Sequence, residues 1–183
     1  MRYTDGKSIK IVEKVLENIQ GKLAKKLKNA VTIKKAVIGE RVEELGYVGK
    51  FTSVKVLEIE KVLKKGKIAV ISPVGKNKRG HILNFNADEV AGGIAAQVKA
   101  KKLIFFTDVP GVLDDKKKTI TAIKIGDIKK LVDRKIIRGG MLPKITGCVQ
   151  AVKKGVGEVD ILDINLKGTK ILQDKPKNFT ELH

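Results

Sequence analysis

The sequence predicts an α/β domain of three layers (αβα), in which helices cover both faces of a largely parallel sheet. Short apolar runs alternate along the chain with segments whose apolar residues recur every three or four positions, and this alternation is typical of βαβ units. The clearest apolar runs are residues 67–72, 103–106 and 159–162. Strands that are apolar along their whole length are usually buried on both faces. We therefore expect these three segments to be the inner strands.

The elements of the N-terminal third follow from local signals. Thr4 and Asp5 can cap a helix, because their side chains accept hydrogen bonds from free backbone N–H groups. Gly21 is a point at which this helix could divide. The β-branched segment 31–38 predicts a strand, and the glycines of 46–49 predict a turn or the start of a hairpin. The apolar positions that define the helix are Ile9, Val12, Leu16, Ile19 and Leu23.

The rest of the chain continues the alternation. Ser53 is expected to cap a second helix that ends at Gly66. Asn86 and Glu89 have the spacing of a capping box, which predicts the start of a helix over 87–100. We further expect a basic loop over 75–80, a charged hairpin tip over 114–118, helices over 125–135 and 141–154, a last strand over 169–172 and a polar tail from 173.

Length and composition suit one α/β domain. The 183 residues are 42% hydrophobic, which is enough for a core of that size. No apolar run approaches the roughly 18 residues that span a bilayer, and the N-terminus lacks the apolar region of a signal peptide. The expected compartment is therefore the cytoplasm or an organelle matrix. The single cysteine, Cys148, lies in a helical pattern and is expected to be a small buried residue.

The net charge of +19 raises the possibility of nucleic-acid binding. The cations are mostly lysines spread along the whole chain, and aromatic residues make up only 4%. Recognition of bases and phosphates usually relies on arginine and on stacking aromatic rings. We therefore interpret the charge as a solvated lysine surface that attracts anionic substrates, and nucleic-acid binding stays the less favoured alternative.

Three polar or glycine clusters lie at the ends of the predicted strands. They are residues 84–88, residues 107–111 and the pair Gly139-Gly140, which precedes the helix that carries Lys144. Open α/β sheets bind ligands at the carboxyl ends of their strands. The helix that begins near Asp88 is expected to offer free backbone N–H groups to an anion. The glycines would let the backbone approach a ligand closely.

The order and spacing of these clusters resemble the N-acetylglutamate kinases of the amino-acid kinase family. The resemblance runs from about Arg2 to Asp163. It implies a carbamate kinase-like fold and the transfer of the γ-phosphate of ATP, bound with Mg²⁺, to the γ-carboxylate of N-acetyl-L-glutamate, the second step of arginine biosynthesis. It also implies a homo-oligomer in the full-length family. The stretches that carry it are 2–5, 46–49, 52–54, 71–75, 84–92, 103–113 and 139–144.

The same resemblance implies a role for each site residue. Lys144 would stabilise charge on the nucleotide side, and Asp88 would orient the catalytic lysines. Asn84 and Arg2 would bind the acetylglutamate, the arginine pairing with its α-carboxylate. No residue is expected to hold a metal by itself, because Mg²⁺ would arrive with ATP. The residues that would border the nucleotide are Thr107, Asp108, Gly111, Val112, Leu113, Gly140 and Met141.

Two features of the family pattern do not occur in this sequence. One is the Lys-x-Gly-Gly loop that cradles the phosphates and supplies a second catalytic lysine, and the other is a His-Gly-Gly segment. The segments between Lys28 and Glu44 and after Asp163 are also short. We therefore expect a single partial domain with an incomplete N-terminal lobe, from a fragment or a late start codon, and weak or no turnover. A binding protein without turnover is the main alternative, and a decayed gene copy is another.

The expected division of this domain follows from the resemblance. Residues 1–66 would be the remnant of the substrate lobe, residues 67–172 the nucleotide-binding lobe and residues 173–183 a polar tail.

Overall fold

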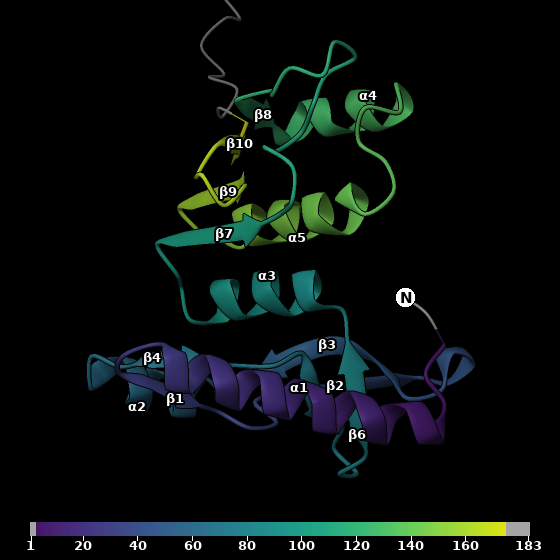
Figure 1. Cartoon of the computed structure of the whole chain (residues 1–183). Helices are drawn as coiled ribbons and strands as arrows, with labels where there is room; N and C mark the ends of the chain where they lie inside the picture. The colour runs from purple at the N-terminus through teal and green to yellow at the C-terminus, as the bar shows by residue number, and fades with distance from the viewer. Residues whose placement is uncertain (1–2, 175–183) are drawn as a thin grey trace, which may run out of the picture. The chain divides into compact units, whose positions relative to one another are not determined.

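The computed structural model of the chain describes residues 3–174 and consists of two compact units, Met1–Val98 and Lys99–His183 (Figure 1). The mixed α/β class with parallel-rich sheets is confirmed. The described strands form three separate sheets: a two-stranded pair, a closed barrel and a four-stranded sheet. The lobe boundary expected at residue 66 stays a prediction, because compactness does not say which ligand each part binds. Within the described residues, no helix is long and apolar enough to span a bilayer.

The expectation of three inner strands is wrong for two of them. β4 (Ile68–Val70) pairs only with β1 (Ala30–Thr32), in parallel. β7 (Lys102–Phe106) lies at the edge of the four-stranded sheet, whose order is β7-β9-β10-β8. β9 (Glu158–Leu162) is an inner strand, as expected. An apolar run therefore indicated a strand correctly, but it did not fix the neighbours of that strand.

The first helix, α1 (Gly6–Lys26), begins where the sequence predicted. The Asp5 carboxylate accepts hydrogen bonds from the backbone N–H groups of Lys7 and Ser8, at 2.9 and 2.6 Å. The bonds with Ser8 are the main reason that the pKa of Asp5 is lowered. The helix is continuous through Gly21, because one glycine costs about 1 kcal/mol and packing offsets that cost.

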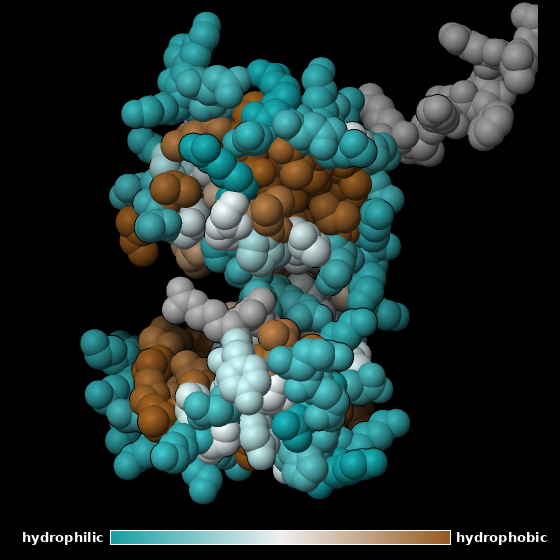
Figure 2. Space-filling model, turned by 90° about the vertical axis from the view of Figure 1, so that its right-hand side faces the viewer, coloured by the Kyte–Doolittle hydropathy of each residue, from teal (hydrophilic) through white to brown (hydrophobic). Residues whose placement is uncertain are grey.

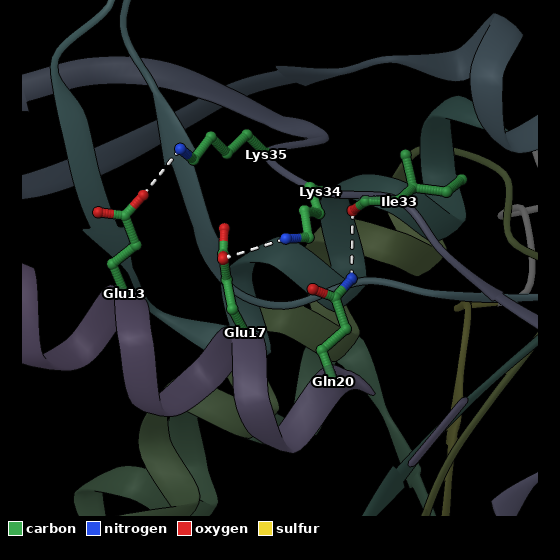
Figure 3. A network of polar contacts seen from close by, with 6 residues as sticks. All are labelled: Glu13, Glu17, Gln20, Ile33, Lys34 and Lys35. Atoms are coloured by element: carbon green, nitrogen blue, oxygen red, sulfur yellow. Dashed lines mark hydrogen bonds and ion pairs between the residues drawn. The ribbon is translucent and has the colours of Figure 1, made fainter. Parts of the chain in front are cut away.

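A buried amide fastens α1 to the β1–β4 pair (Figure 3). Gln20 is 3% exposed, and its Nε2 donates to the carbonyl oxygens of Ile33 and Val70, at 3.2 and 2.6 Å. Two ion pairs at the surface join the same helix to the turn between β1 and β2. Lys34 pairs with Glu17, and Lys35 pairs with Glu13. Surface pairs typically contribute about 0–1 kcal/mol. The buried amide matters more, because an unpaired buried polar group costs about 1–3 kcal/mol.

The closed barrel of β2 (Val37–Val42), β3 (Val48–Val54), β6 (Ile82–Phe85) and β5 (Val74–Lys76) is the centre of the first unit. Phe85 fills it, and a Cβ atom on Gly39 or on Gly49 would lie 2.3 Å from the Phe85 ring. A Cβ on Gly75 would lie 2.0 Å from the Val37 carbonyl oxygen. Glycine inside these strands therefore permits a barrel this narrow, since any side chain would displace the ring or the adjacent strand.

Helices complete the first unit. A 3₁₀ turn, η1 (Glu43–Leu45), leads into β3, which runs on to Val54, so Ser53 lies in a strand and does not cap α2 (Val56–Lys64). α3 (Ala87–Gln97) begins at Asn86 as predicted. Its Ile94 packs against a core cluster of Val37, Leu83, Phe85 and Val90. The barrel and α3 therefore share one core.

The second unit packs a sheet against a helix. β10 (Gly168–Leu172) pairs antiparallel with β9 and parallel with β8 (Ala122–Lys124). α5 (Met141–Lys153) packs on β9 and β10, and Cys148 is fully buried in it, as expected. The turn η2 (Ile125–Asp127) and α4 (Ile128–Asp133) connect β8 to α5.

The sequence overstated the burial of β7. Phe105 is buried, but Ile104 and Phe106 are 36% and 56% exposed. β9 joins β10 through the short turn 163–167, and that connection carries no helix. On the exposed face, Lys102 and Lys170 contact the Glu158 carboxylate, each at 2.9 Å. Hydrogen bonds from Lys170, and then from Lys102, lower the pKa of Glu158 to about 2.

Candidate active site

A pocket of about 550 Å³ opens in the second unit between two loops. One loop follows β7 and includes residues 109–117, and the other joins α4 to α5 over residues 134–141. Figure 2 shows apolar surface framed by hydrophilic residues on this unit. The apolar lining is Val109, Val112, Leu113, Ile136 and Met141, and the charged lining is Asp114, Asp115, Lys117, Arg134, Lys135 and Arg138.

The structure brings four of the seven predicted nucleotide residues to this pocket: Gly111, Val112, Leu113 and Met141. Asp115 pairs with Arg134 at 2.7 Å, which leaves Lys117, Lys135 and Arg138 as the further cations of the rim beside Asp114. Apolar walls with an excess of cations around them suit a flat heteroaromatic base that carries phosphates. The sequence did not single out Arg134, Lys135 and Arg138, although they line the same space. The sequence had placed Arg134 and Lys135 at the end of a helix over 125–135, but α4 ends at Asp133, so both lie in the loop before α5.

Thr107 and Asp108 lie beside the pocket, directly after β7. The Thr107 backbone N–H donates to the Leu162 carbonyl oxygen at 2.9 Å, which extends the β7–β9 ladder by one residue. The Thr107 hydroxyl donates to Asp108 Oδ1 at 3.2 Å. Both residues therefore lie at the carboxyl end of a parallel strand, where open α/β sheets bind ligands.

Lys144 lies near the same strand end. It is in the first turns of α5, and its Nζ is 6.0 Å from the centroid of the Phe105 ring in β7. The arrowhead of β7 and the first turn of α5 lie at the same end of the unit (Figure 1). Lys144 and the predicted Thr107 and Asp108 are thus gathered at one end of one unit.

The start of α5 leaves few backbone N–H groups for an anion. The Met141 and Leu142 N–H groups donate to the carbonyl oxygens of Arg138 and Gly139, at 3.1 and 3.2 Å, and Pro143 has no N–H. Gly139 has a φ of +55°, and a Cβ on Gly139 or on Gly140 would meet no atom within 4 Å. The glycines therefore leave open space, and positive charge at this end must come from side chains such as Lys144.

In the first unit, the start of α3 corrects another expectation. The Asn86 side chain accepts hydrogen bonds from the backbone N–H groups of Asp88 and Glu89, at 2.9 and 3.1 Å. Those N–H groups are therefore already occupied, and two carboxylates stand in the first turn. Negative side chains repel a bound anion, so this helix start does not offer the anion site predicted from its position alone.

Of the two predicted substrate residues, only Asn84 in β6 lies within the described part of the chain. Arg2 lies outside the described residues. The Thr4 carbonyl oxygen accepts from the Tyr47 N–H at 2.7 Å, and the Tyr47 carbonyl oxygen accepts from the Asn84 N–H at 2.9 Å. Arg41 also supports this turn, because its Nε donates to the Gly46 carbonyl oxygen at 2.7 Å and its guanidinium lies 4.6 Å from the Tyr47 ring.

Asp88 and Lys144 belong to different units, Met1–Val98 and Lys99–His183. Their convergence in one cleft, and the roles given to all the site residues, therefore stay predictions. Among residues 3–174, no group of three or more His, Cys, Asp and Glu side chains is arranged to hold a metal ion.

Comparison with known proteins identifies the class that this fold and site define. The profile of the amino acid kinase family matches residues 9–163. An acetylglutamate kinase from Endomicrobium trichonymphae is 40% identical over 93% of this chain and 74% of its own length. One from Clostridioides difficile is 42% identical over 89% of this chain and 62% of its own.

A solved structure agrees with these sequence relatives. The protein smu.665 from Streptococcus mutans superposes with a TM-score of 0.88 at 32% identity, over 95% of this chain and 75% of its own. The chain therefore belongs to the amino acid kinase family, with acetylglutamate kinases as its relatives. It spans between about half and three quarters of the length of the curated relatives that it matches.

Proposed function

We propose that the chain carries the nucleotide site and part of the substrate site of an acetylglutamate kinase. The reaction is the transfer of the γ-phosphate of ATP to the γ-carboxylate of N-acetyl-L-glutamate, which gives an acyl phosphate in arginine biosynthesis. The observation that supports it best is the pocket of about 550 Å³ beside the loop that follows β7, which joins apolar walls to a charged rim in which cations outnumber carboxylates. The expected compartment is the cytoplasm or an organelle matrix.

The reaction depends on the alignment of the substrates and on charge neutralisation more than on proton transfer. A carboxylate is already ionised at neutral pH and can attack phosphorus without a general base. Catalysis then rests on alignment of the two substrates and on neutralisation of charge on the transferring group. Lys144 supplies that charge on the nucleotide side, Asp88 orients the catalytic lysines, and Asn84 and Arg2 hold the acetylglutamate.

Mg²⁺ enters this proposal as part of the ATP complex. Phosphate oxygens and water would supply most of its ligands, as is usual for nucleotide-bound magnesium.

A variant of the pocket wall tests the nucleotide site. Leu113→Glu places a carboxylate against bound phosphates and base, and we expect it to weaken Mg-ATP binding by at least about tenfold, or about 1.4 kcal/mol. Leu166→Glu is the matched control, since Leu166 is exposed on the β9–β10 turn outside this pocket. Calorimetric titration of both variants checks it. Equal affinities in the two variants would place the nucleotide elsewhere.

An assay for acyl phosphate and a titration with an oligonucleotide, run beside the Mg-ATP titration, separate the alternatives. A binding protein without turnover would take up Mg-ATP and form no acyl phosphate. A nucleic-acid-binding protein would prefer an oligonucleotide, with an affinity that falls steeply as salt rises.

Self-association is the second part of the proposal. α1 and its C-cap, Leu27, expose an apolar ridge in which five residues follow one another at steps of four, each at least 42% exposed. Rows at this spacing pack into the grooves of a second helix, and a two-fold axis would bring the ridge of one copy onto that of another. The ridge consists of Ile11, Val15, Ile19, Leu23 and Leu27.

A charge in the middle of the ridge should separate the copies. We expect Ile19→Glu to convert a dimer to a monomer in sedimentation velocity at physiological salt, because it buries an unpaired carboxylate. Leu57→Glu, on the exposed surface of α2, should leave the dimer intact. A monomeric parent chain, or a dimer that survives Ile19→Glu, would exclude this interface.

A further inference from the structure

One wall of the pocket is a hairpin loop from Val112 to Ile120, which lies between β7 and β8 and is bridged between Leu113 and Thr119. Its tip holds itself together: Asp114 N–H donates to the Lys118 carbonyl oxygen at 2.8 Å, and Asp114 Oδ1 accepts from the N–H groups of Lys116 and Lys118. Leu113, Asp114, Asp115 and Lys117 of this hairpin face the pocket. The shape of the wall is therefore set locally, but its position depends on its base.

One hydroxyl bonds to both sides of that base, and next to it the Lys170 N–H donates to the Thr121 carbonyl oxygen at 2.9 Å. Thr169 in β10 is fully buried, and its Oγ1 accepts from the Val112 N–H at 2.8 Å and donates to the Ile120 carbonyl oxygen at 2.7 Å. The Ile120 N–H donates in turn to the Val112 carbonyl oxygen at 2.8 Å. The three bonds form a closed ring in which a single side chain ties both strands of the hairpin to the sheet.

Gly111 confirms how close this contact is. A Cβ atom at Gly111 would lie 2.5 Å from Thr169 Oγ1 and 2.7 Å from the Thr169 backbone nitrogen. Gly111 also has a φ of +82°, which an L side chain rarely adopts. The chain can therefore pass against Thr169 only with glycine there, and the next residue, Val112, donates to the hydroxyl.

Thr169 does not line the pocket itself and can affect the pocket only through its hydrogen bonds to the hairpin. It is not among the residues that line the pocket, whereas Val112, which donates to its hydroxyl, and the preceding Gly111 are. Without the hydroxyl, the buried Val112 N–H and the Ile120 carbonyl oxygen would lack this partner, and buried polar groups that lose a partner move to regain one.

We propose that Thr169 is the positioning residue of the nucleotide pocket, acting by holding the base of the 112–120 hairpin in place. The proposal rests on the pocket being the nucleotide site, as proposed above. It predicts that the hydroxyl matters for nucleotide affinity, although it contacts no nucleotide, and that the methyl group does not.

The test compares variants that separate the hydroxyl from the rest of the side chain. Thr169→Val keeps the shape and loses both hydrogen bonds, whereas Thr169→Ser keeps the hydroxyl. We expect Thr169→Val to weaken Mg-ATP binding at least tenfold in calorimetry and to speed amide exchange at Val112 at least tenfold. Thr169→Ser should stay within about threefold of the parent in both measurements. Amides of β9 should be protected in every variant.

The possible results of these measurements separate the role of the Thr169 hydroxyl from the proposed function. Parent-like ATP affinity in Thr169→Val, with Val112 still protected, would overturn the proposal. If the parent chain binds no Mg-ATP, the proposed function fails, and Val112 exchange alone then decides whether the hydroxyl positions the hairpin. If Thr169→Val does not fold, Thr169→Ser and Thr169→Ala, which differ by one oxygen, replace it, and equal exchange at Val112 in those two would contradict the proposal.

Discussion

Joining the N-terminal segment of a full-length acetylglutamate kinase to this chain before Arg2 is expected to raise acyl phosphate formation by at least about 100-fold. The segment supplies the Lys-x-Gly-Gly loop, which the sequence lacks. Loss of one donor that neutralises charge in a transition state typically costs about 100- to 1,000-fold in rate. Hydroxylamine trapping of the acyl phosphate, with the 183-residue chain measured beside the chimera, gives the comparison.

The chimera has its own matched control. The same segment with the loop lysine replaced by alanine completes the chain equally well but lacks the charge. It should recover Mg-ATP binding more than it recovers turnover, because that charge is needed mainly in the transition state. Robust turnover by the 183-residue chain alone would show that the loop is less important than proposed.

Lys144→Ala in the active chimera is expected to lower kcat by about 100- to 1,000-fold and to change acetylglutamate binding by less than about threefold. Lys144 lies at the start of α5, where the Met141 and Leu142 N–H groups are already bonded and Pro143 has none. Backbone groups at this end therefore offer little to replace the lost charge.

Lys153→Ala is the control for that substitution. Lys153 lies in the last turn of the same helix. Its replacement by alanine therefore removes one positive charge from α5, as Lys144→Ala does, but far from the carboxyl end of β7. Steady-state kinetics with both substrates should show parent-like kcat for Lys153→Ala. Unchanged turnover in Lys144→Ala would mean that the catalytic assignment is wrong.

Most elements of the fold could be predicted because their signals are local. Asp5 and Asn86 cap α1 and α3 through hydrogen bonds to residues two and three positions on. Gly155, with a φ of +88°, follows α5 where the sequence placed its end. Signals of this kind need no knowledge of the rest of the chain.

The arrangement of the strands could not be predicted, because it depends on contacts between distant residues. The barrel forms because Gly39 and Gly49 leave room for the Phe85 ring, which lies more than 30 positions further along the sequence. The run 103–106 predicted a strand buried on both faces, but composition alone does not reveal whether an element covers the second face. Phe106 is exposed there.

The residues of the candidate site also fall into those that local signals predicted and those that depend on distant contacts. Glycines and polar residues after strands pointed to the pocket and to the end of β7, because position along a strand fixes which end a residue occupies. Arg134, Lys135 and Arg138 were missed, since nothing in a basic loop tells whether it faces a cavity. Thr169 was missed because its hydrogen bonds join residues 49 and 57 positions away.

The most direct test of the proposed activity follows the γ-phosphate itself. ATP labelled at the γ-phosphate is mixed with the chimera and N-acetyl-L-glutamate, and the labelled products are separated before and after hydroxylamine, which converts an acyl phosphate to a hydroxamate and inorganic phosphate. We predict that the label appears as hydroxylamine-sensitive acyl phosphate, that it requires N-acetyl-L-glutamate, and that Lys144→Ala abolishes most of it while Lys153→Ala does not. Label released only as inorganic phosphate, or acyl phosphate formed equally well by Lys144→Ala, would contradict the account.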